Sequence, residues 1–173
     1  MSIRQETAQL LASLRGVWDE EAVDELDHAL QSAARAIADG ADDELVLAAA
    51  LHDVGHSPLL AGTSAAHDRV ARDWLTPRFG ERVGWLAGAH VAAKRFLAAT
   101  DPGYAAGLSP VSVASLRAQG GAAADPVFAA DPWWPDALRL RRYDDAAKDP
   151  SAQGADLEAV VALAARVAAR RTR

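Results

Sequence analysis

Apolar residues recur every three or four positions along most of the chain, and alanine is abundant among them. This spacing gathers apolar side chains on one face of a helix, and runs of β-branched residues, which favour strands, are absent. The sequence therefore predicts an all-α fold. We expect helices over residues 3–14, 20–39, 42–53, 65–78, 81–99, 110–119, 132–148 and 156–170.

Glycine, proline and acidic residues mark where these helices begin and end. Gly40 follows the second helix as a C-cap residue, and Asp42 or Asp43 is placed to cap the third. Ser109 followed by Pro110 is the usual start of a helix, and residues 122–131 are expected to be irregular. No linker or internal repeat divides the chain, so residues 1–173 are predicted to form one domain with a core at about 18–148.

Composition and charge narrow the class of protein. A formal net charge of −6 argues against nucleic acid or an anionic membrane as the partner. The chain has no cysteine, which excludes disulfides and thiolate metal ligands. It shows no membrane-spanning apolar run and no signal-peptide pattern near Met1, so a cytoplasmic enzyme-sized domain is the expectation.

All five histidines lie between residues 28 and 90, and His52-Asp53 follows an almost entirely aliphatic run. A carboxylate near the core needs a partner charge, and no lysine or arginine lies nearby in the sequence. A metal ion would supply that charge. Further ligand candidates are His28, His67, His90, and Asp144 or Asp145.

Six nitrogen and oxygen ligands are too many for one catalytic metal that keeps an open position, whereas two metals sharing Asp53 would use them all. Such ligands suit iron, manganese or zinc. Each residue also has an ordinary structural reading. A lone histidine is often a hydrogen-bonded core residue, Lys94 is compatible with a surface charge, and Asp144-Asp145 with surface acids of a helix.

Five segments together resemble one family. They are His28-Ala29-Leu30-Gln31, residues 50–56 around His52-Asp53, residues 90–97 from His90 to Leu97, residues 115–121 from Ser115 to Gly121, and residues 140–148 from Leu140 to Lys148. The chain resembles the HD-domain mixed-valent diiron oxygenases that cleave organophosphonates, which are relatives of myo-inositol oxygenase. The resemblance implies a single HD-domain helical bundle with a dinuclear metal site in its core.

The resemblance also implies roles for individual residues. One iron would be held by His28, His52, Asp53 and Asp144, and the second by Asp53, His67 and His90. The substrate's phosphonate would be bound by His56, Lys94, Ser115 and Gln119.

The implied reaction is the cleavage of a C–P bond by O2 at an Fe(II)/Fe(III) pair. The substrate would be 2-amino-1-hydroxyethylphosphonate or an N-substituted analogue, and the products a carboxylic acid such as glycine and phosphate. An upstream 2-oxoglutarate-dependent hydroxylase would supply the 1-hydroxy compound. We expect the protein to be a monomer.

The sequence departs from the family pattern at two places. Counting back from His28, Trp18 stands where the family has a tyrosine, whereas Glu21 falls at the position of the family's glutamate. Both are candidates to contact a cationic part of the substrate. The loop after Gly121 also differs. Two other functions stay open: an HD phosphohydrolase acting on a nucleotide or phosphomonoester, which needs only His28, His52, Asp53 and Asp144, and a metal-dependent interaction domain without catalysis.

Overall fold

The computed structural model describes residues 1–19, 22–60 and 66–171, and within these ranges it contains α-helices, one short 3-10 helix and no strand. The predicted all-α fold is confirmed. The elements are α1 (Ile3–Ala12), α2 (Glu25–Ala38), α3 (Asp43–Leu51), η1 (Val54–His56), α4 (His67–Phe79), α5 (Glu81–Thr100), α6 (Pro102–Gly107), α7 (Pro110–Ala118), α8 (Pro126–Ala129), α9 (Trp134–Ala146) and α10 (Leu157–Arg171).

The start of α2 corrects the sequence prediction. A helix was expected from residue 20, but α2 begins at Glu25 because Asp24 takes the N-cap position and its side chain accepts a hydrogen bond from the backbone N–H of Asp27. The Asp24 carboxylate also accepts from the N–H of Gly16, which ties the preceding loop to the helix start. The described residues 17–19 and 22–24 therefore lie outside the helix.

The end of α3 is a second correction, and it matters for the site. The helix was predicted to continue through Asp53, but it ends at Leu51, and a 3-10 turn over Val54–His56 follows. Gly55 lies against the backbone of His67, so that a Cβ at this position would be 2.0 Å from the carbonyl oxygen of His67. The close approach explains why the chain breaks here, and it joins the start of α4 to the end of α3.

Two short helices were not predicted. Asp101-Pro102 begins α6 and Asp125-Pro126 begins α8, each with the aspartate side chain as N-cap and proline in the first turn. Residues 122–131 are therefore not wholly irregular. These helices have six and four residues, too few to show an apolar period in the sequence. The α9 helix also starts at Trp134, two residues after the expected Pro132.

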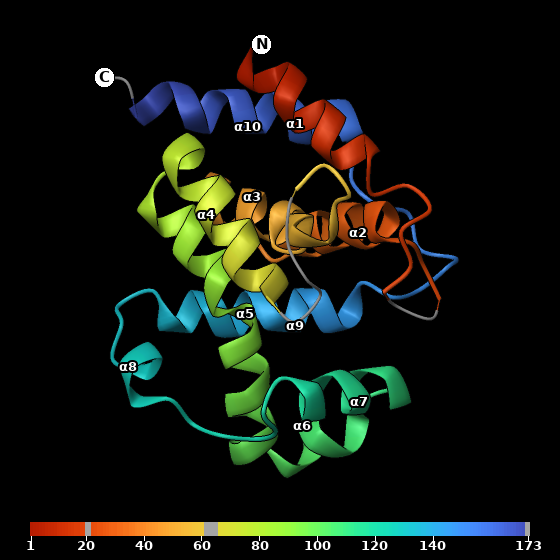
Figure 1. The fold of residues 1–173 in the computed structure, drawn as a ribbon, viewed down its shortest axis with the longest axis vertical. Coiled ribbons are helices and arrows are strands. Elements are labelled where there is room, and N and C mark those ends of the chain that lie inside the picture. The colour runs from red at the N-terminus through yellow and green to blue at the C-terminus, as the bar shows by residue number, and fades with distance from the viewer. Residues whose placement is uncertain (20–21, 61–65, 172–173) are drawn as a thin grey trace.

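The helices form a bundle around α5, which is the longest element at 20 residues. It packs against α4, α9 and α3, while α1 and α10 lie together across one end of the molecule (Figure 1). The α6 and α7 helices lie at the opposite end. Most of α3 is buried, from Leu45 to Leu51, so the segment that leads into His52 and Asp53 passes through the apolar core. None of the described helices is long and apolar enough to cross a membrane.

Candidate metal centre

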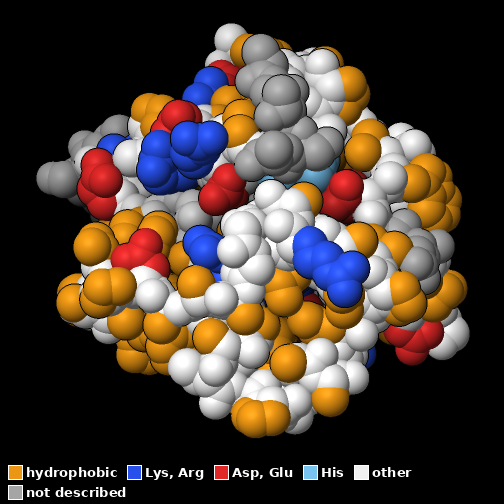
Figure 2. All heavy atoms as spheres, turned by 60° about the horizontal axis from the view of Figure 1, so that its bottom comes forward, with side chains coloured by type: hydrophobic (Ala, Val, Ile, Leu, Met, Phe, Trp, Pro, Cys, Tyr) orange, Lys and Arg blue, Asp and Glu red, His pale blue; other side chains and the backbone are white. Residues whose placement is uncertain are grey.

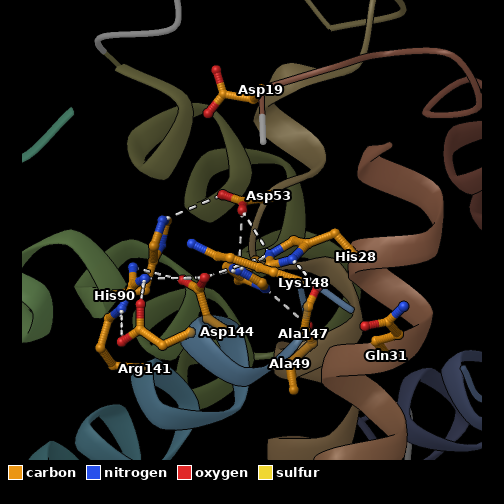
Figure 3. A network of polar contacts seen from close by, with 12 residues as sticks. Asp19, His28, Gln31, Ala49, Asp53, His90, Arg141, Asp144, Ala147 and Lys148 are labelled. Atoms are coloured by element: carbon orange, nitrogen blue, oxygen red, sulfur yellow. Dashed lines mark hydrogen bonds and ion pairs between the residues drawn. The ribbon is translucent and has the colours of Figure 1, made fainter. Parts of the chain in front are cut away.

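The predicted ligands come from separate helices and meet in the middle of the bundle (Figure 3). His28 lies on α2, His52 caps the end of α3, His67 begins α4, and His90 lies on α5. Asp144 lies on α9. Except for the partly exposed Asp53, these residues are buried: His28, His52, His67, His90 and Asp144. Burying so many titratable groups together is costly unless they bind a shared ion.

One group of ligand atoms surrounds the Oδ2 atom of Asp53. The Nε2 atoms of His28 and His52 lie 3.4 and 3.1 Å from it, and 3.3 Å from each other. Asp144 closes the group, at 3.5 Å from His28 and 3.3 Å from His52. The four residues offer atoms close enough together to hold one metal ion.

A second group surrounds the other oxygen of the same carboxylate. The Nε2 atoms of His67 and His90 lie 3.5 and 3.3 Å from Asp53 Oδ1, and 3.0 Å from each other. Asp53 thus turns one oxygen toward each pair of histidines. This arrangement suits a carboxylate that bridges two metal ions, and its nitrogen and oxygen donors suit iron, manganese or zinc.

Backbone carbonyls orient three of the histidine rings. The Nδ1 atoms of His28, His52 and His90 lie 2.9, 2.8 and 2.6 Å from the carbonyl oxygens of Ala147, Ala49 and Ala87. A carbonyl only accepts, so Nδ1–H is the donor and Nε2 is the atom left to bind a metal. Such contacts fix the tautomer and the ring plane of metal-binding histidines.

His56 lies beside the second group. Its ring stacks on that of His67 at a centroid distance of 4.4 Å, and its Nε2 atom is 3.9 Å from Asp53 Oδ1 and 3.6 Å from Asp19. Asp53, His56 and His67 also offer atoms within reach of a common ion. The Nε2 atom of His90 lies closer to Asp53 Oδ1, at 3.3 Å, than that of His56 does.

The structure separates the two adjacent aspartates of α9. Asp144 faces the histidines, whereas Asp145 turns away and accepts hydrogen bonds from Tyr104 at 2.7 Å and from the Nε atom of Arg141 at 3.0 Å. The guanidinium of the buried Arg141 also pairs with the Asp144 carboxylate, with nitrogen-to-oxygen distances of 2.7 and 3.1 Å. Sequence reasoning missed Arg141, although its spacing of three and four residues from the aspartates was a usable signal.

The charges of the cluster shift the pKa values of its members. Burial alone would lower the pKa of His28, but Asp53 and Asp144 overcome it and raise that pKa to about 9. Burial alone would also lower the pKa of His52, but the same two carboxylates raise it well above its usual value. Burial would raise the pKa of Asp53, but the neighbouring histidines lower it well below its usual value. Metal binding must therefore displace protons from His28 and His52.

Because of this proton displacement, the stability of the metal-free protein and its affinity for metal should change with pH in opposite directions. A raised pKa for His28 stabilises the metal-free fold fully below pH 6.5, and that stability is lost as the pH rises through about 9. The lowered pKa of His90 acts only below 6.5, and the lowered pKa of Lys94, about 8, opposes the fall only in the upper part of this window. We expect the melting temperature of chelator-treated protein to fall between these pH values while metal affinity rises. A melting temperature of the metal-free protein that increases over the window would contradict this coupling.

Two lysines, the only ones in the chain, lie next to the cluster. Lys94, one turn after His90 on α5, is buried and donates to the Oγ atom of Ser115. The Nζ atom of Lys148 lies 3.2 Å from the Oγ atom of Ser112. Both serines lie on α7. Burial, Arg141 and Lys148 lower the pKa of Lys94 to about 8. The α7 side of the site is therefore rich in cations and hydroxyls, as an oxyanion requires.

The other predicted substrate residues are less central. Gln119 follows α7 and lines a pocket of about 240 Å³ with Arg95 and Phe128, and its buried Oε1 atom has no hydrogen-bond partner among the described residues. Trp18 is 64% exposed. Glu21 lies outside the described residues.

Two surface features lie at one end of the molecule. Figure 2 looks onto the end that carries α6 and α7, and there a histidine side chain is visible with acidic side chains on either side of it. A pocket of about 380 Å³ lies at this end, lined by residues of α6, α7 and α9 that include Tyr104, Ser112, Asp145 and Lys148. The pocket borders the site at Lys148 and Asp145, but none of the histidines lines it.

One buried acid was not predicted. Glu25, in the first turn of α2, is 1% exposed, and its Oε2 atom has no hydrogen-bond partner among the residues that the structure describes. Burial and the nearby Asp53 raise the pKa of Glu25 to about 8. Only its spacing of three residues before His28, on the same helix face, pointed to it in the sequence.

Together, the fold and site define a class: an all-helical protein whose bridging carboxylate and four histidines form a candidate dinuclear centre. Similar proteins place it further. No family model matches the chain. It is 36% identical over 151 residues to the hydroxymethylphosphonate dioxygenase of Gimesia maris, covering 80% of this chain and 75% of that protein. The chain belongs to this family of phosphonate dioxygenases.

Two further relatives match shorter stretches. A 1-hydroxy-2-(trimethylamino)ethylphosphonate dioxygenase of Leisingera caerulea, which forms glycine betaine, is 35% identical over 108 residues, or 58% of this chain and 55% of that protein. An uncharacterized protein of Acanthamoeba polyphaga mimivirus is 32% identical over 140 residues, or 74% of this chain and 64% of its own length. The predicted family resemblance is confirmed.

Proposed function

We propose that this protein cleaves the C–P bond of a 1-hydroxyphosphonate with O2 at a mixed-valent Fe(II)/Fe(III) centre. The substrate is 2-amino-1-hydroxyethylphosphonate or an N-substituted analogue. The primary amine would give glycine and phosphate, and these two products contain all the atoms of the substrate and one O2. The named activities of the two dioxygenase relatives support this reaction type.

The position of Asp53 is the main structural support. Its two oxygens face different histidine pairs, His28 with His52 and His67 with His90, at 3.1 to 3.5 Å. A mononuclear hydrolase needs only the first pair with Asp144. The second pair has no purpose in that reading, yet both of its rings are buried, and a backbone carbonyl orients the ring of His90.

The residues fit two irons by the chemistry of the donor set. Four imidazoles and two carboxylates, with no thiolate, match the nitrogen and oxygen ligands of non-haem iron. When bound, the irons would supply the activation of O2 and the Lewis acidity that a hydroxyphosphonate needs. The chain supplies the rest: it holds the ligands rigidly, excludes water with the packed faces of α3 and α5, and positions the substrate.

Substrate positioning would fall to the α7 side of the cluster. Lys94 supplies a buried positive charge and Ser115 a hydroxyl, and both suit a phosphonate oxygen. His56 lies beside His67 with its Nε2 atom toward Asp53 and Asp19. Its imidazole is therefore close enough to the second group to contact a substrate held there. Gln119 would add a further hydrogen bond.

Oxygen dependence tests the proposal most directly. We expect iron-loaded, partly reduced protein to release one phosphate for each O2 consumed with 2-amino-1-hydroxyethylphosphonate, and none in anaerobic buffer. The same preparation should show a coupled Fe(II)/Fe(III) electron paramagnetic resonance signal that the substrate alters. Anaerobic phosphate release from a nucleotide or phosphomonoester with manganese would instead establish the phosphohydrolase.

The number of metals tests the second group separately. We expect two irons per chain in the wild type and one in His90→Ala, because His90 holds only the second ion in this arrangement. An unchanged metal content in both His90→Ala and His67→Ala would overturn the dinuclear proposal.

Replacing Lys94 should weaken substrate binding more than catalysis. Loss of a buried charge that pairs with the phosphonate should raise KM by about 10- to 100-fold in Lys94→Met, since such charge-assisted contacts contribute about 1.5–3 kcal/mol. Steady-state kinetics checks this. Arg117→Met, an exposed change on α7, serves as the control and should keep the wild-type KM. An equal KM for Lys94→Met and wild type would remove Lys94 from the substrate site.

The same proposal extends to the pathway around the enzyme. A 1-hydroxyphosphonate must be made from its alkylphosphonate by oxygen insertion at C1, the class of reaction that a 2-oxoglutarate-dependent hydroxylase performs. We infer that such an enzyme acts immediately before this one, and that the protein works as a monomer in the cytoplasm.

A further inference from the structure

The α6 and α7 helices lie outside the hydrophobic core, at the end of the bundle opposite α1 and α10 (Figure 1). Among the described residues, neither helix contributes to the core or to the apolar side chains packed against it. Side-chain hydrogen bonds join them instead to the helices of the metal centre: Tyr104 to Asp145, Ser112 to Lys148, and Ser115 to Lys94. The contact of Tyr104 differs from the others because it reaches the residue next to a candidate metal ligand.

Tyr104 begins a continuous chain of hydrogen bonds. Its hydroxyl donates to the Oδ2 atom of Asp145 at 2.7 Å, and the same oxygen accepts from the Nε atom of Arg141 at 3.0 Å. The guanidinium of Arg141 in turn pairs with both oxygens of Asp144, at 2.7 and 3.1 Å. The chain therefore runs from α6, which supplies no ligand in the candidate set, to a candidate ligand of the first ion on α9.

The position of Arg141 depends on the carboxylate of Asp145. Arg141 is buried between the two aspartates, so its orientation is set by how each of them is held. Within the described part of the chain, the Asp145 side chain has two partners, Arg141 and Tyr104. Burial raises the pKa of Tyr104, so its hydroxyl stays protonated and remains a donor. Removing this donor would leave Asp145, which is 23% exposed, free to turn toward water.

We propose that Tyr104 is a positioning residue for the first metal ion: it holds Asp145, Asp145 holds Arg141, and Arg141 orients the carboxylate of Asp144. The inference rests on the dinuclear centre proposed above and gives α6 a part in it. Outer contacts of this kind fix the direction and basicity of a ligand. Their loss therefore weakens metal binding and catalysis without emptying the site.

The first test is Tyr104→Phe, which removes the hydroxyl and keeps the ring. In iron-loaded protein we expect kcat with 2-amino-1-hydroxyethylphosphonate to fall by about 3- to 10-fold, because one hydrogen bond behind a ligand is lost. KM and iron content should stay at their wild-type values. The coupled Fe(II)/Fe(III) electron paramagnetic resonance signal should shift in substrate-free protein, where a contact between Tyr104 and substrate cannot contribute.

Tyr143→Phe is the matched control. Tyr143 is the only other tyrosine of the chain, and its hydroxyl donates to Asp39, a surface carboxylate that also pairs with Arg139 at 2.9 Å. The variant therefore loses the same kind of contact, from a tyrosine to an arginine-bound aspartate. It should keep the wild-type kcat and resonance signal. An equal shift of the signal in both variants would contradict a specific role for Tyr104.

A double-mutant cycle tests whether Tyr104 acts through Asp145. Calorimetric titration of chelator-treated protein with manganese(II) gives metal affinity without turnover, and we expect that affinity to fall by about 3- to 10-fold in Tyr104→Phe. In an Asp145→Ala background, which lacks the acceptor, Tyr104→Phe should cause no further loss of affinity or kcat.

Three outcomes would overturn the inference. Additive losses in the cycle would show that Tyr104 acts independently of Asp145. A raised KM with unchanged kcat would place Tyr104 against the substrate, through the pocket that it lines. Unchanged kcat, manganese affinity and resonance signal in Tyr104→Phe would leave it with no role in the centre. If wild type releases no phosphate from the phosphonate with O2, the proposed function fails, while the manganese titrations still decide the role of Tyr104.

Discussion

Asp144→Asn should lose the first metal ion, while the same change at the neighbouring Asp145 should not. Asp144 faces His28 and His52 at 3.5 and 3.3 Å, and an amide is a much weaker ligand than a carboxylate. We expect one iron fewer per chain and a loss of activity on the order of 10³-fold, equivalent to about 4 kcal/mol at 1.36 kcal/mol per tenfold. Metal analysis and phosphate release measure the two effects.

Asp145→Asn is the matched control because it alters the adjacent residue of the same helix. Asp145 is held by Arg141 and Tyr104 and touches none of the histidines among the described contacts. Its loss should loosen Arg141 and reduce activity by about tenfold at most, with full metal content, as outer contacts of a metal site do. Equal metal loss in the two variants would mean that Asp144 is not a ligand.

Gly55→Ala should damage the second half of the cluster without replacing any of the candidate ligands. The added Cβ would lie 2.0 Å from the carbonyl oxygen of His67 and 2.7 Å from its Cα atom. Backbone atoms cannot rotate away, so α4 must shift and carry His67 with it. We expect a destabilisation of about 1–3 kcal/mol, which is about 2–12 °C in melting temperature for a chain of this size. Iron content should fall toward one per chain.

Gly107→Ala provides the comparison, because a Cβ there meets no atom within 4 Å. Alanine is favoured over glycine in a helix, so this variant should be as stable as wild type or slightly more so. Thermal unfolding and metal analysis of the two variants, made side by side, separate steric overlap from the general effect of removing a glycine. A Gly55→Ala protein with wild-type stability and two irons would show that the chain can relax around the overlap.

The cluster was predictable because its members have few other reasons to occur in an apolar helix. His52 and Asp53 end a run from Leu45 to Leu51 that is wholly buried, so their polarity in that context already indicated a metal. The preference for Asp144 over Asp145 came from the family resemblance rather than from spacing. The structure supports that preference by turning only Asp144 toward the histidines.

Other features depended on contacts between distant segments, which one sequence cannot reveal. Gly55 reads as a helix breaker, but its closeness to His67 follows from the packing of η1 on α4. Glu25 looks like an ordinary acid of a first helical turn, and its burial beside Asp53 arises from the way α2 packs on α3. The short helices α6 and α8 escaped detection because their capping pairs are followed by too few residues for a period.

Lysine is much rarer than arginine in this chain, so the lysines beside the site can be modified selectively. Eighteen residues carry a basic side chain, and only Lys94 and Lys148 among them have a primary amine. Both reach serines of α7, and the pKa of Lys94, lowered to about 8 by burial and neighbouring cations, leaves part of its amine unprotonated near neutral pH. An amine-selective acylating reagent therefore meets only these two side chains, and its other target is the α-amino group of Met1. Mass spectrometry of peptides from the acylated chain separates the three amines, so the acylation of Lys94 and Lys148 gauges whether the candidate substrate site is occupied.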